Sequence, residues 1–301
     1  MKLKMAVLGA NSMVGSRFCE MASSDFQLIK ADLSSCILVD ITDKNSVENF
    51  FKNKDFEWVI LFSAFTDVDA AEQQRTNKDG SCWKINVEGA GNVVEACRKY
   101  KRKLIFISTD FVFDGVRGNY TENDPPGPNF DKVSWYGITK AEAEKIISDG
   151  SKNYIILRIA YPYRGKFAGK DDLAKIILRL YRQKQLYPMF NDQKISPTFI
   201  DDIAPAVSLL ISKGVTGIVN LASPVPSTPY EFAKELITRF GGNWRDLKTG
   251  SIGQFLKQKG KTPRPINGSL NVEKIKSLGY SPLDWKMGIK TIYTQSKGNL
   301  L

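Results

Sequence analysis

Short apolar runs alternate with helix-like segments along the first half of the chain. Strands are predicted at 3–9, 26–32, 58–65, 103–109 and 154–159. The short apolar run at 36–39 is counted as a further strand, so the strand at 154–159 is the sixth. Nearly continuous apolar runs of this length are typical of strands buried on both faces of a parallel sheet. Segments with helical spacing separate them, at 16–22, 86–97 and 135–147. The alternation predicts a doubly wound parallel α/β sheet.

The pattern changes after residue 163. Helices are predicted at 172–184, 230–240 and 272–278, with strands between them at 195–200 and 217–221. Residues 111–130 are rich in Gly, Pro, Asn and Asp, and predict a loop that orders in part around a ligand. We therefore predict a dinucleotide-binding domain of residues 1–163, joined by 195–221, and a smaller, mostly C-terminal α/β substrate-binding domain of residues 164–194 and 222–301.

A glycine turn follows the first apolar run. Gly9 allows a tight turn, Gly15 allows the next helix to approach the strand closely, and the helix N-terminus offers free N–H groups to a pyrophosphate. Ser12 stands where this pattern usually has its middle glycine, so its hydroxyl either crowds the phosphates or donates a hydrogen bond to them. The turn predicts a Rossmann-type sheet, with cofactor contacts from Gly9, Asn11, Ser12, Met13, Val14 and Gly15.

Acidic and strand-end residues extend the predicted cofactor site. Asp32 ends the second strand, where a carboxylate accepts the ribose hydroxyls of NAD and repels a 2′-phosphate. NADH is therefore favoured over NADPH, and Lys30 and two nearby serines soften that preference. The remaining predicted contacts are Asp40 and Ile41 for an adenine pocket, and Ser63, Ala64 and Phe65 after the strand at 58–65.

Tyr136 and Lys140 are spaced to share one face of a helix, one turn apart. An ammonium group there lowers the pKa of the phenol, and Thr109, at the polar end of its strand, lies at the edge where open α/β sheets bind ligands. These three groups can protonate or deprotonate an oxygen while hydride moves to or from its carbon. The chain has no histidine, which favours this chemistry over a Ser-His-Asp mechanism. A Tyr-x-x-x-Lys spacing also occurs by chance on solvated helices.

Composition narrows the remaining classes. The chain has 301 residues, 42% hydrophobic and 25% charged, without an uninterrupted apolar stretch of membrane-spanning length. The apolar start stops at Gly9, so we interpret it as a strand and expect a cytoplasmic protein. The four cysteines are widely spaced, and no metal site is expected.

The net charge of +11 allows nucleic acid, an anionic membrane surface or a phosphorylated small molecule as a partner. Lysines are spread along the chain, often beside acidic residues, without a dense basic block. We interpret them as a solvated basic surface, with an anionic nucleotide ligand as the next reading. Neither a nucleic-acid nor a membrane partner is expected.

Several motifs together carry a family resemblance. They include S-T-D-F-V-F-D-G at 108–115, F-T-D-V-D-A-A-E at 65–72, I-N-V-E-G at 85–89, Y-G-I-T-K at 136–140 and R-P at 264–265. With these motifs the chain resembles extended short-chain dehydrogenases/reductases, and more narrowly the dTDP-4-dehydrorhamnose reductases. The resemblance covers nearly the whole chain.

The resemblance implies reduction, by NADH or NADPH, of a nucleotide-linked 4-keto-6-deoxy sugar. Tyr136 is then the general acid, Lys140 and Thr109 assist it, and Asn86 positions the lysine, often through water. Lys140 also contacts the cofactor. The implied substrate contacts are Thr66, Val68, Ser108, Phe111, Tyr161 and Arg264.

Departures from the family pattern leave some of these roles open. Tyr161 replaces a tryptophan that stacks on the sugar, and is alternatively a core aromatic. Arg264 is a candidate for the substrate diphosphate, or else a solvated arginine. The segment 128–134 is longer than the usual lead into the active tyrosine, which predicts an altered approach to the site.

Another class of function stays open from the sequence. A non-catalytic, cofactor-binding regulatory subunit similar to the β-subunit of methionine adenosyltransferase shares many of these motifs. The partner expected for a reductase is a nucleotide sugar, and a homodimer is left open.

Overall fold

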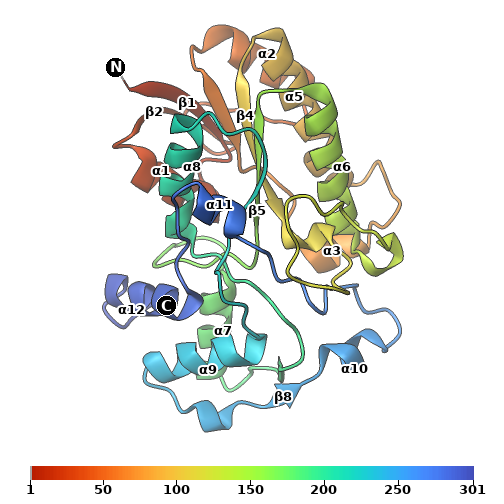
Figure 1. Ribbon diagram of the computed structural model, residues 1–301, viewed down its shortest axis with the longest axis vertical. Coiled ribbons are helices and arrows are strands. Elements are labelled where there is room, and N and C mark those ends of the chain that lie inside the picture. Colours follow the sequence, from red (N-terminus) through yellow and green to blue (C-terminus); the bar gives the residue numbers. More distant parts are fainter. Residues whose placement is uncertain (1) are drawn as a thin grey trace.

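A six-stranded parallel sheet forms one half of the protein, seen at the top of Figure 1. The computed structural model describes residues 2–301. The strand order is β2-β1-β3-β4-β5-β7, so the connections reverse direction beside β1. The strands are β1 (Leu3–Leu8), β2 (Phe26–Ala31), β3 (Trp58–Leu61), β4 (Lys103–Thr109), β5 (Tyr154–Ile159) and β7 (Gly217–Asn220). The predicted doubly wound α/β class is confirmed.

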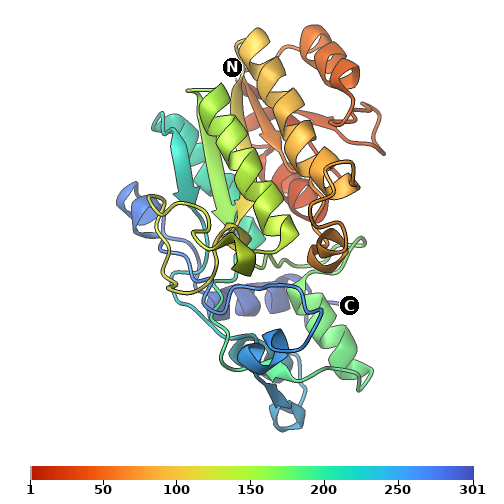
Figure 2. The ribbon, with the colours of Figure 1, turned by 90° about the vertical axis from the view of Figure 1, so that its right-hand side faces the viewer.

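Helices cover both faces of the sheet (Figures 1 and 2). Successive strand residues point to opposite faces, so Met5 and Val7 join one core while Ala6 and Leu8 join the other. The first core is closed by α1 (Met13–Ala22), α8 (Ile203–Ser212) and α11 (Glu273–Ser277). The second is closed by α2 (Lys44–Asn53), α5 (Gly89–Lys99) and α6 (Trp135–Gly150). Both faces are thus buried, which explains why the strands are apolar along their whole length.

A third core lies in the lower half of Figure 1. Its central side chains include Ile177, Phe232, Trp285 and Ile289, all nearly or fully buried. They come from α7 (Leu173–Arg182), α9 (Pro229–Arg239) and α12 (Trp285–Gln295), beside a small sheet of β6 (Met189–Phe190) and β8 (Thr249–Gly250) and the short α10 (Ile252–Leu256). This core is separate from the two cores that flank the sheet, although α11, from the predicted smaller domain, packs in the first of those.

Two predicted strands are wrong. The run 36–39 forms only an isolated bridge, between Asp32 and Leu38, and the Leu38 side chain is 68% exposed. The segment Tyr154–Ile159 is therefore the fifth strand, not the sixth. Residues 195–200 are loop with isolated bridges, followed by a 3-10 turn at Ile200–Asp202. Pro197 lacks the N–H that a ladder needs.

Two helices, α8 and α12, were not predicted from the sequence. The α8 segment is apolar on most sides and carries Pro205 in its first turn, so it lacks a clear helical stripe. Proline is tolerated in a first turn because the N–H there has no intrahelical partner. Burial against α1 and the sheet, rather than amphipathic pattern, accounts for this helix.

The loop at 111–130 is held by contacts within the chain. The rings of Phe113 and Tyr120 stack with centroids 4.0 Å apart, and the backbone N–H of Tyr120 donates to Ser269 O at 2.9 Å. The Asn267 N–H donates to Gly115 O at 2.8 Å. The loop and the segment 265–270 therefore form one packed unit.

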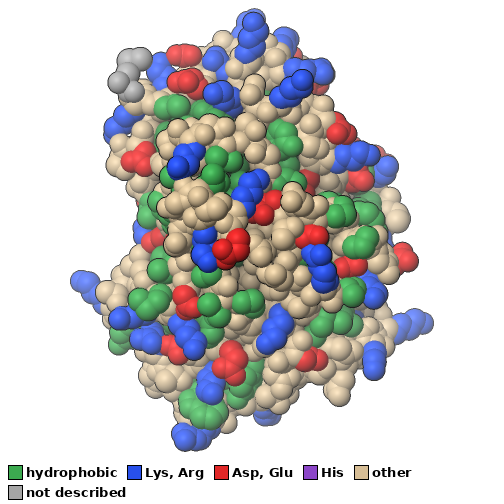
Figure 3. Space-filling view, in the orientation of Figure 1, with side chains coloured by type: hydrophobic (Ala, Val, Ile, Leu, Met, Phe, Trp, Pro, Cys, Tyr) green, Lys and Arg blue, Asp and Glu red, His purple; other side chains and the backbone are tan. Residues whose placement is uncertain are grey.

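Charged side chains of both signs are interspersed on the face shown in Figure 3. Lysines and arginines outnumber acidic residues in the chain as a whole, but on this face they do not gather into one block. No helix within residues 2–301 has the length and apolar character needed to cross a membrane.

Candidate active site

A cleft of about 940 Å³ lies at the carboxyl ends of β1, β3 and β4, and α7 closes its far side. Ligands of doubly wound sheets bind at this edge, where the strand order reverses. Most residues predicted for the site line it: Gly9, Asn11, Ser12, Met13, Val14, Asp32, Asp40, Ile41, Ser63, Ala64, Thr66, Val68, Ser108, Thr109, Phe111, Tyr136, Lys140, Tyr161 and Arg264. Gly15, Phe65 and Asn86 do not.

The turn after β1 leaves no room for a side chain at Gly9 or at Gly15. Gly9 has a φ of +84°, and a Cβ on it would lie 2.5 Å from Ser63 N. A Cβ on Gly15 would lie 2.2 Å from Gly9 O. The Ser12 hydroxyl donates to Gly9 O at 2.7 Å and accepts from Gly15 N at 3.0 Å, so it caps α1 from within the turn. The Ser12 hydroxyl is therefore bonded within the turn, and the turn at the start of α1 fits the pyrophosphate of a dinucleotide.

The next part of the cleft offers carboxylates where a ribose and an adenine would lie. Asp32 Oδ2 accepts from Asn11 N at 2.9 Å, and Asn11 Nδ2 donates to Ser34 O at 3.2 Å. Asp40 Oδ1 accepts from the backbone and hydroxyl of Thr42 at 2.9 and 2.7 Å. Asp32 is thus fixed by the first turn with acceptor capacity to spare, which fits a ribose diol.

The catalytic pair predicted on α6 is brought to the end of β4. Ser134 caps the helix by accepting from Gly137 N at 3.2 Å. Lys140 is 2% exposed, and its Nζ donates to Ile107 O at 2.7 Å. Burial lowers the pKa of Lys140 to about 7, with the charges of Glu144 and Cys82 acting in the opposite direction. The ammonium charge of Lys140 is therefore adjustable near neutral pH.

Burial raises the pKa of Tyr136 above its ordinary value. A hydrogen bond with Thr109 opposes that rise, whereas the charge of Asp110 adds to it. Loss of solvation is the largest effect on this pKa in the protein alone, so the lowering by Lys140 stays a prediction. A high pKa keeps the phenol protonated, which is the form a general acid needs.

Asp110 is a site residue that the sequence reasoning missed. It is 1% exposed and lines the cleft, and its Oδ1 accepts from Thr109 Oγ1 at 3.1 Å. Its Oδ2 has no hydrogen-bond partner within residues 2–301, and burial raises its pKa to about 7. Buried polar atoms are normally paired, so this oxygen is a candidate acceptor for a ligand donor. The signal was available, since Asp110 directly follows Thr109 in the most specific motif.

Two residues predicted for the site use their side chains elsewhere. Ser108 lines the cleft, but its Oγ donates to Glu144 Oε1 at 2.5 Å. Asn86 Oδ1 accepts from Phe65 N at 2.8 Å, and its Nδ2 donates to Phe65 O at 3.1 Å and Thr139 Oγ1 at 3.0 Å. Asn86 therefore joins the loop after β3 to α6, and its amide is already occupied.

The far wall of the cleft contains the aromatic and cationic candidates. Tyr161 has a φ of +42°, rare for a side chain of this size, and its hydroxyl accepts from Gln193 Nε2 at 3.2 Å. Arg264 Nη2 donates to both carboxylate oxygens of Asp69 at 2.8 Å, across the cleft on α3 (Val68–Glu72). Its other guanidinium nitrogens stay available to a second anion.

Other lining residues had no sequence signal of function. They are chiefly Lys84 and the run Lys170, Asp171, Asp172, Leu173 and Ile176. Lys170 Nζ donates to Thr66 Oγ1 at 3.3 Å, a second contact across the cleft. Residues 170–176 lead into and form the start of α7, whose place in the chain could be predicted from the sequence but whose orientation could not.

The unusual segment 128–134 does not line the cleft. It forms a short 3-10 turn at Phe130–Lys132, and Val133 O accepts from Arg75 Nη2 at 2.6 Å. Ser134, at the end of this segment, caps α6. The altered approach to the site stays a prediction.

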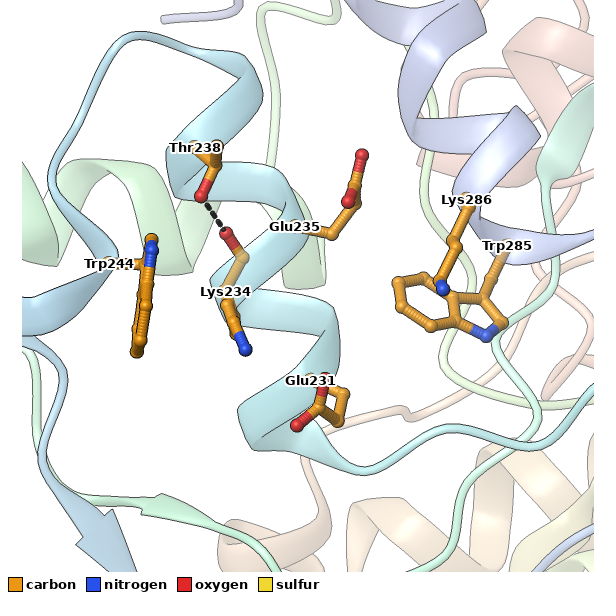
Figure 4. Close-up of a pocket in the computed structure, with 7 residues that line it drawn as sticks. All are labelled: Glu231, Lys234, Glu235, Thr238, Trp244, Trp285 and Lys286. Atoms are coloured by element: carbon orange, nitrogen blue, oxygen red, sulfur yellow. Dashed lines mark hydrogen bonds between the residues drawn. The ribbon is translucent and has the colours of Figure 1, made fainter.

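A second, smaller groove of about 280 Å³ crosses the exposed face of α9 (Figure 4). Trp244 and Trp285 flank the helix, and Lys234 Nζ lies 4.4 Å from a Trp244 ring centroid. Thr238 Oγ1 donates to Lys234 O at 2.8 Å. The groove contains none of the predicted site residues, so the chemistry belongs to the larger cleft.

A Rossmann-type sheet with this glycine turn and a Tyr/Lys pair at the end of β4 defines a nucleotide-dependent oxidoreductase. Residues 3–297 match the family model described as RmlD substrate binding domain. The chain belongs to that family.

Similar proteins agree with this assignment. The dTDP-4-dehydrorhamnose reductase of Mycolicibacterium smegmatis is 28% identical over 294 residues, 96% of this chain and 85% of that one. A solved dTDP-4-dehydrorhamnose reductase from Clostridium acetobutylicum is 27% identical, with a TM-score of 0.83 over 98% of this chain and 100% of that one. One from Bacillus anthracis, in complex with NADP, has a TM-score of 0.84 at 24% identity over 98% and 99% of the two chains, which shows the fold.

The other class of protein considered also matches. Methionine adenosyltransferase 2 subunit beta of Pongo abelii is 25% identical over 260 residues, 84% of this chain and 74% of that one.

Proposed function

We propose that the protein is an NAD(P)H-dependent reductase that converts dTDP-4-dehydrorhamnose to dTDP-L-rhamnose. The observation that carries this proposal is the convergence of Tyr136, Thr109 and Lys140 with the unpartnered Asp110 carboxylate in one cleft. The glycine turn Gly9–Gly15 faces the same space. Binding and acid-base groups for a carbonyl reduction therefore lie together.

The residues present fit a nicotinamide dinucleotide. The N-terminus of α1 would hold the pyrophosphate, Asp32 the adenosine ribose, and Asp40 and Ile41 the adenine. Lys140 would contact the ribose next to the nicotinamide. Asp32 favours NADH, because a 2′-phosphate would lie against its carboxylate.

When bound, the nicotinamide supplies the hydride. Thr109 hydrogen-bonds the sugar carbonyl oxygen, and Tyr136 donates its phenolic proton to the alkoxide that forms there. A free phenol has a pKa near 10, and lowering it to ~7 requires ~4 kcal/mol of preferential phenolate stabilisation. Burial adds to that requirement, so the positive charge of Lys140 is needed beside Tyr136 during proton transfer.

The substrate is held from both walls of the cleft. Asp110 Oδ2 accepts from a sugar hydroxyl, which satisfies its buried, unpartnered oxygen. Tyr161 packs against the sugar, with its ring centroid 6.0 Å from that of Phe111. Arg264 offers its remaining N–H groups to the diphosphate while one nitrogen stays on Asp69.

The experiment is an assay with a panel of nucleotide-linked 4-keto sugars and both reduced cofactors. We expect turnover of dTDP-4-dehydrorhamnose, with a higher kcat/KM for NADH than for NADPH. Turnover of a different sugar would correct the substrate but keep the reductase. Cofactor binding without turnover of any sugar, together with recovery of an adenosyltransferase in a pull-down, would favour the regulatory subunit instead.

A further inference from the structure

A buried ion pair lies directly behind the catalytic lysine. Glu144 follows Lys140 by one turn of α6, and Arg158 reaches it from β5. Arg158 donates to Glu144 twice, from Nε at 3.0 Å and from Nη2 at 2.6 Å. The two side chains are 0% and 4% exposed. This is a fully enclosed pair, unlike the surface pairs elsewhere in the chain.

Stability alone does not explain this pair. Taking two charges out of water costs about as much as their attraction returns, and apolar replacements of such pairs are often neutral or stabilising. Arg158 Nη1 has no hydrogen-bond partner within residues 2–301, so the guanidinium is also imperfectly satisfied. A charge kept in the core under these conditions suggests a role in the neighbouring site.

The pair is joined to the site through two successive residues of β4. Lys140 Nζ donates to Ile107 O at 2.7 Å, and Ser108 Oγ donates to Glu144 Oε1 at 2.5 Å. The next residue is Thr109, which lines the cleft together with Tyr136. Two side chains of α6 therefore hydrogen-bond the end of β4 next to Thr109, the residue proposed to bind the reacting carbonyl.

The charge of Glu144 also acts on Lys140. Burial lowers the pKa of Lys140, and Glu144 counters that effect more than any other group. The other titratable group that acts on Lys140 is Cys82 from α4 (Ser81–Trp83), in the same direction as Glu144. Tyr136, one turn earlier on α6, lines the same cleft. Arg158, the ion-pair partner of Glu144, is not among the groups that act on Lys140.

We propose that Glu144 is a positioning residue for the reduction: held by Arg158, it fixes Ser108 and thereby Thr109, and it keeps Lys140 charged. The kinetic part of this inference rests on the proposed reductase function. The charge part does not, because it concerns the protein without substrate.

The first test reads the titration of Lys140 directly. In protein labelled with ¹³C at the lysine ε-carbon, the Lys140 resonance is assigned by its loss in Lys140→Met. Glu144→Gln should shift its titration downward by about one pH unit or more, as loss of a close opposite charge does. The matched control is Glu142→Gln, which removes an exposed carboxylate from the same helix. Equal titration in the two variants would overturn the proposal.

The second test uses a variant that keeps the ion pair, since Glu144→Gln leaves Arg158 uncompensated and can unfold the chain. Ser108→Ala removes only the bond between β4 and Glu144. We expect kcat to fall several-fold with KM for the nucleotide sugar unchanged. A raised KM with unchanged kcat would show that Ser108 binds substrate and would overturn the positioning role.

The two proposals fail separately. If no sugar is reduced but Lys140 titrates lower in Glu144→Gln than in Glu142→Gln, the proposed function fails and the effect of Glu144 on Lys140 stands. Suppose instead that the wild-type protein reduces the sugar, that Glu144→Gln titrates like Glu142→Gln, and that Ser108→Ala has the kinetic constants of the wild type. The reductase then stands and the role of Glu144 fails.

Discussion

The two walls of the cleft differ in how their polar atoms are held. On the sheet side, Lys140 and Asp110 are buried, and their partners are the backbone and hydroxyls of the sheet edge. On the far side, Arg264 is 23% exposed and pairs with a carboxylate that is itself 64% exposed. The sheet wall is rigid and desolvated, as acid-base chemistry requires, whereas the far wall can exchange its partners with a ligand. Substitutions on the first should therefore change kcat, and those on the second KM.

The largest effect is expected at Tyr136. Tyr136→Phe removes the general acid while keeping the ring, and should lower kcat by about 10²–10⁴-fold with cofactor affinity nearly intact. Tyr161→Phe is the matched control, a second buried phenol in the same cleft, and should leave kcat within a few-fold. Steady-state turnover and fluorescence titration of the reduced cofactor measure the two quantities. Comparable losses in both variants would remove the distinction between the walls.

Burial of the Asp110 carboxylate in the sheet wall is expected to lower the free energy of unfolding. Its folded pKa is raised to about 7, so the folded state binds more protons than the unfolded state between the ordinary pKa and 7, and stability falls as pH rises through that window. Asp110→Asn removes this cost and should raise the free energy of unfolding at pH 8 by roughly 2–4 kcal/mol, with little change near pH 3.5.

Urea unfolding at the two pH values checks this, with Asp131→Asn, an exposed carboxylate, as the control. The same Asp110 variant should bind the sugar more weakly. If the variant is no more stable than the wild type at pH 8, the Asp110 carboxylate is solvated and water reaches the sheet wall.

Arg264 tests the far wall. Arg264→Gln should raise KM for the nucleotide sugar by about tenfold or more, the effect of losing one charged hydrogen bond, with kcat little changed. Asp69→Asn frees the guanidinium from its partner and should leave KM equal or lower. Initial-rate measurements over a range of substrate concentrations separate the two constants. A fall in kcat without a change in KM would place Arg264 in the chemistry instead.

The smallest effect is expected at Asp32. Asp32→Asn should shift the ratio of kcat/KM for NADPH over NADH upward by roughly tenfold, equivalent to ~1.4 kcal/mol. The reason is removal of repulsion toward a 2′-phosphate. An unchanged ratio would mean that the carboxylate, held by Asn11 N, does not face the ribose.

The two walls also differ in how far their residues could be predicted from the sequence. Gly9, Asp32, Thr109 and Tyr136 follow from local pattern, because parallel strands end at one edge and the helix period sets which residues share a face. The far wall is made by segments around 161, 170 and 264 that meet only through tertiary packing. The roles of Tyr161 and Arg264 were therefore implied by family resemblance, and the lining by Lys170 and Asp171 had no signal.

The errors have physical causes of the same kind. The pKa of Tyr136 moves upward chiefly because the side chain is buried, which the sequence does not show. The substrate contact of Ser108 was implied by the family resemblance, whereas its hydroxyl donates to Glu144, a partner that only the packing of α6 on β4 brings near. The helix α8 was missed because a segment buried on most sides has no amphipathic stripe.

The central claim is that this cleft transfers hydride to a sugar carbonyl and that Tyr136 supplies the proton. The most direct measurement is mass spectrometry of the sugar formed from dTDP-4-dehydrorhamnose with NADH deuterated at the transferring position of C4. The account predicts a reduced sugar one mass unit heavier with the wild-type protein, and almost none with Tyr136→Phe. Reduced sugar without deuterium, or equal deuterium incorporation by Tyr136→Phe, would contradict it.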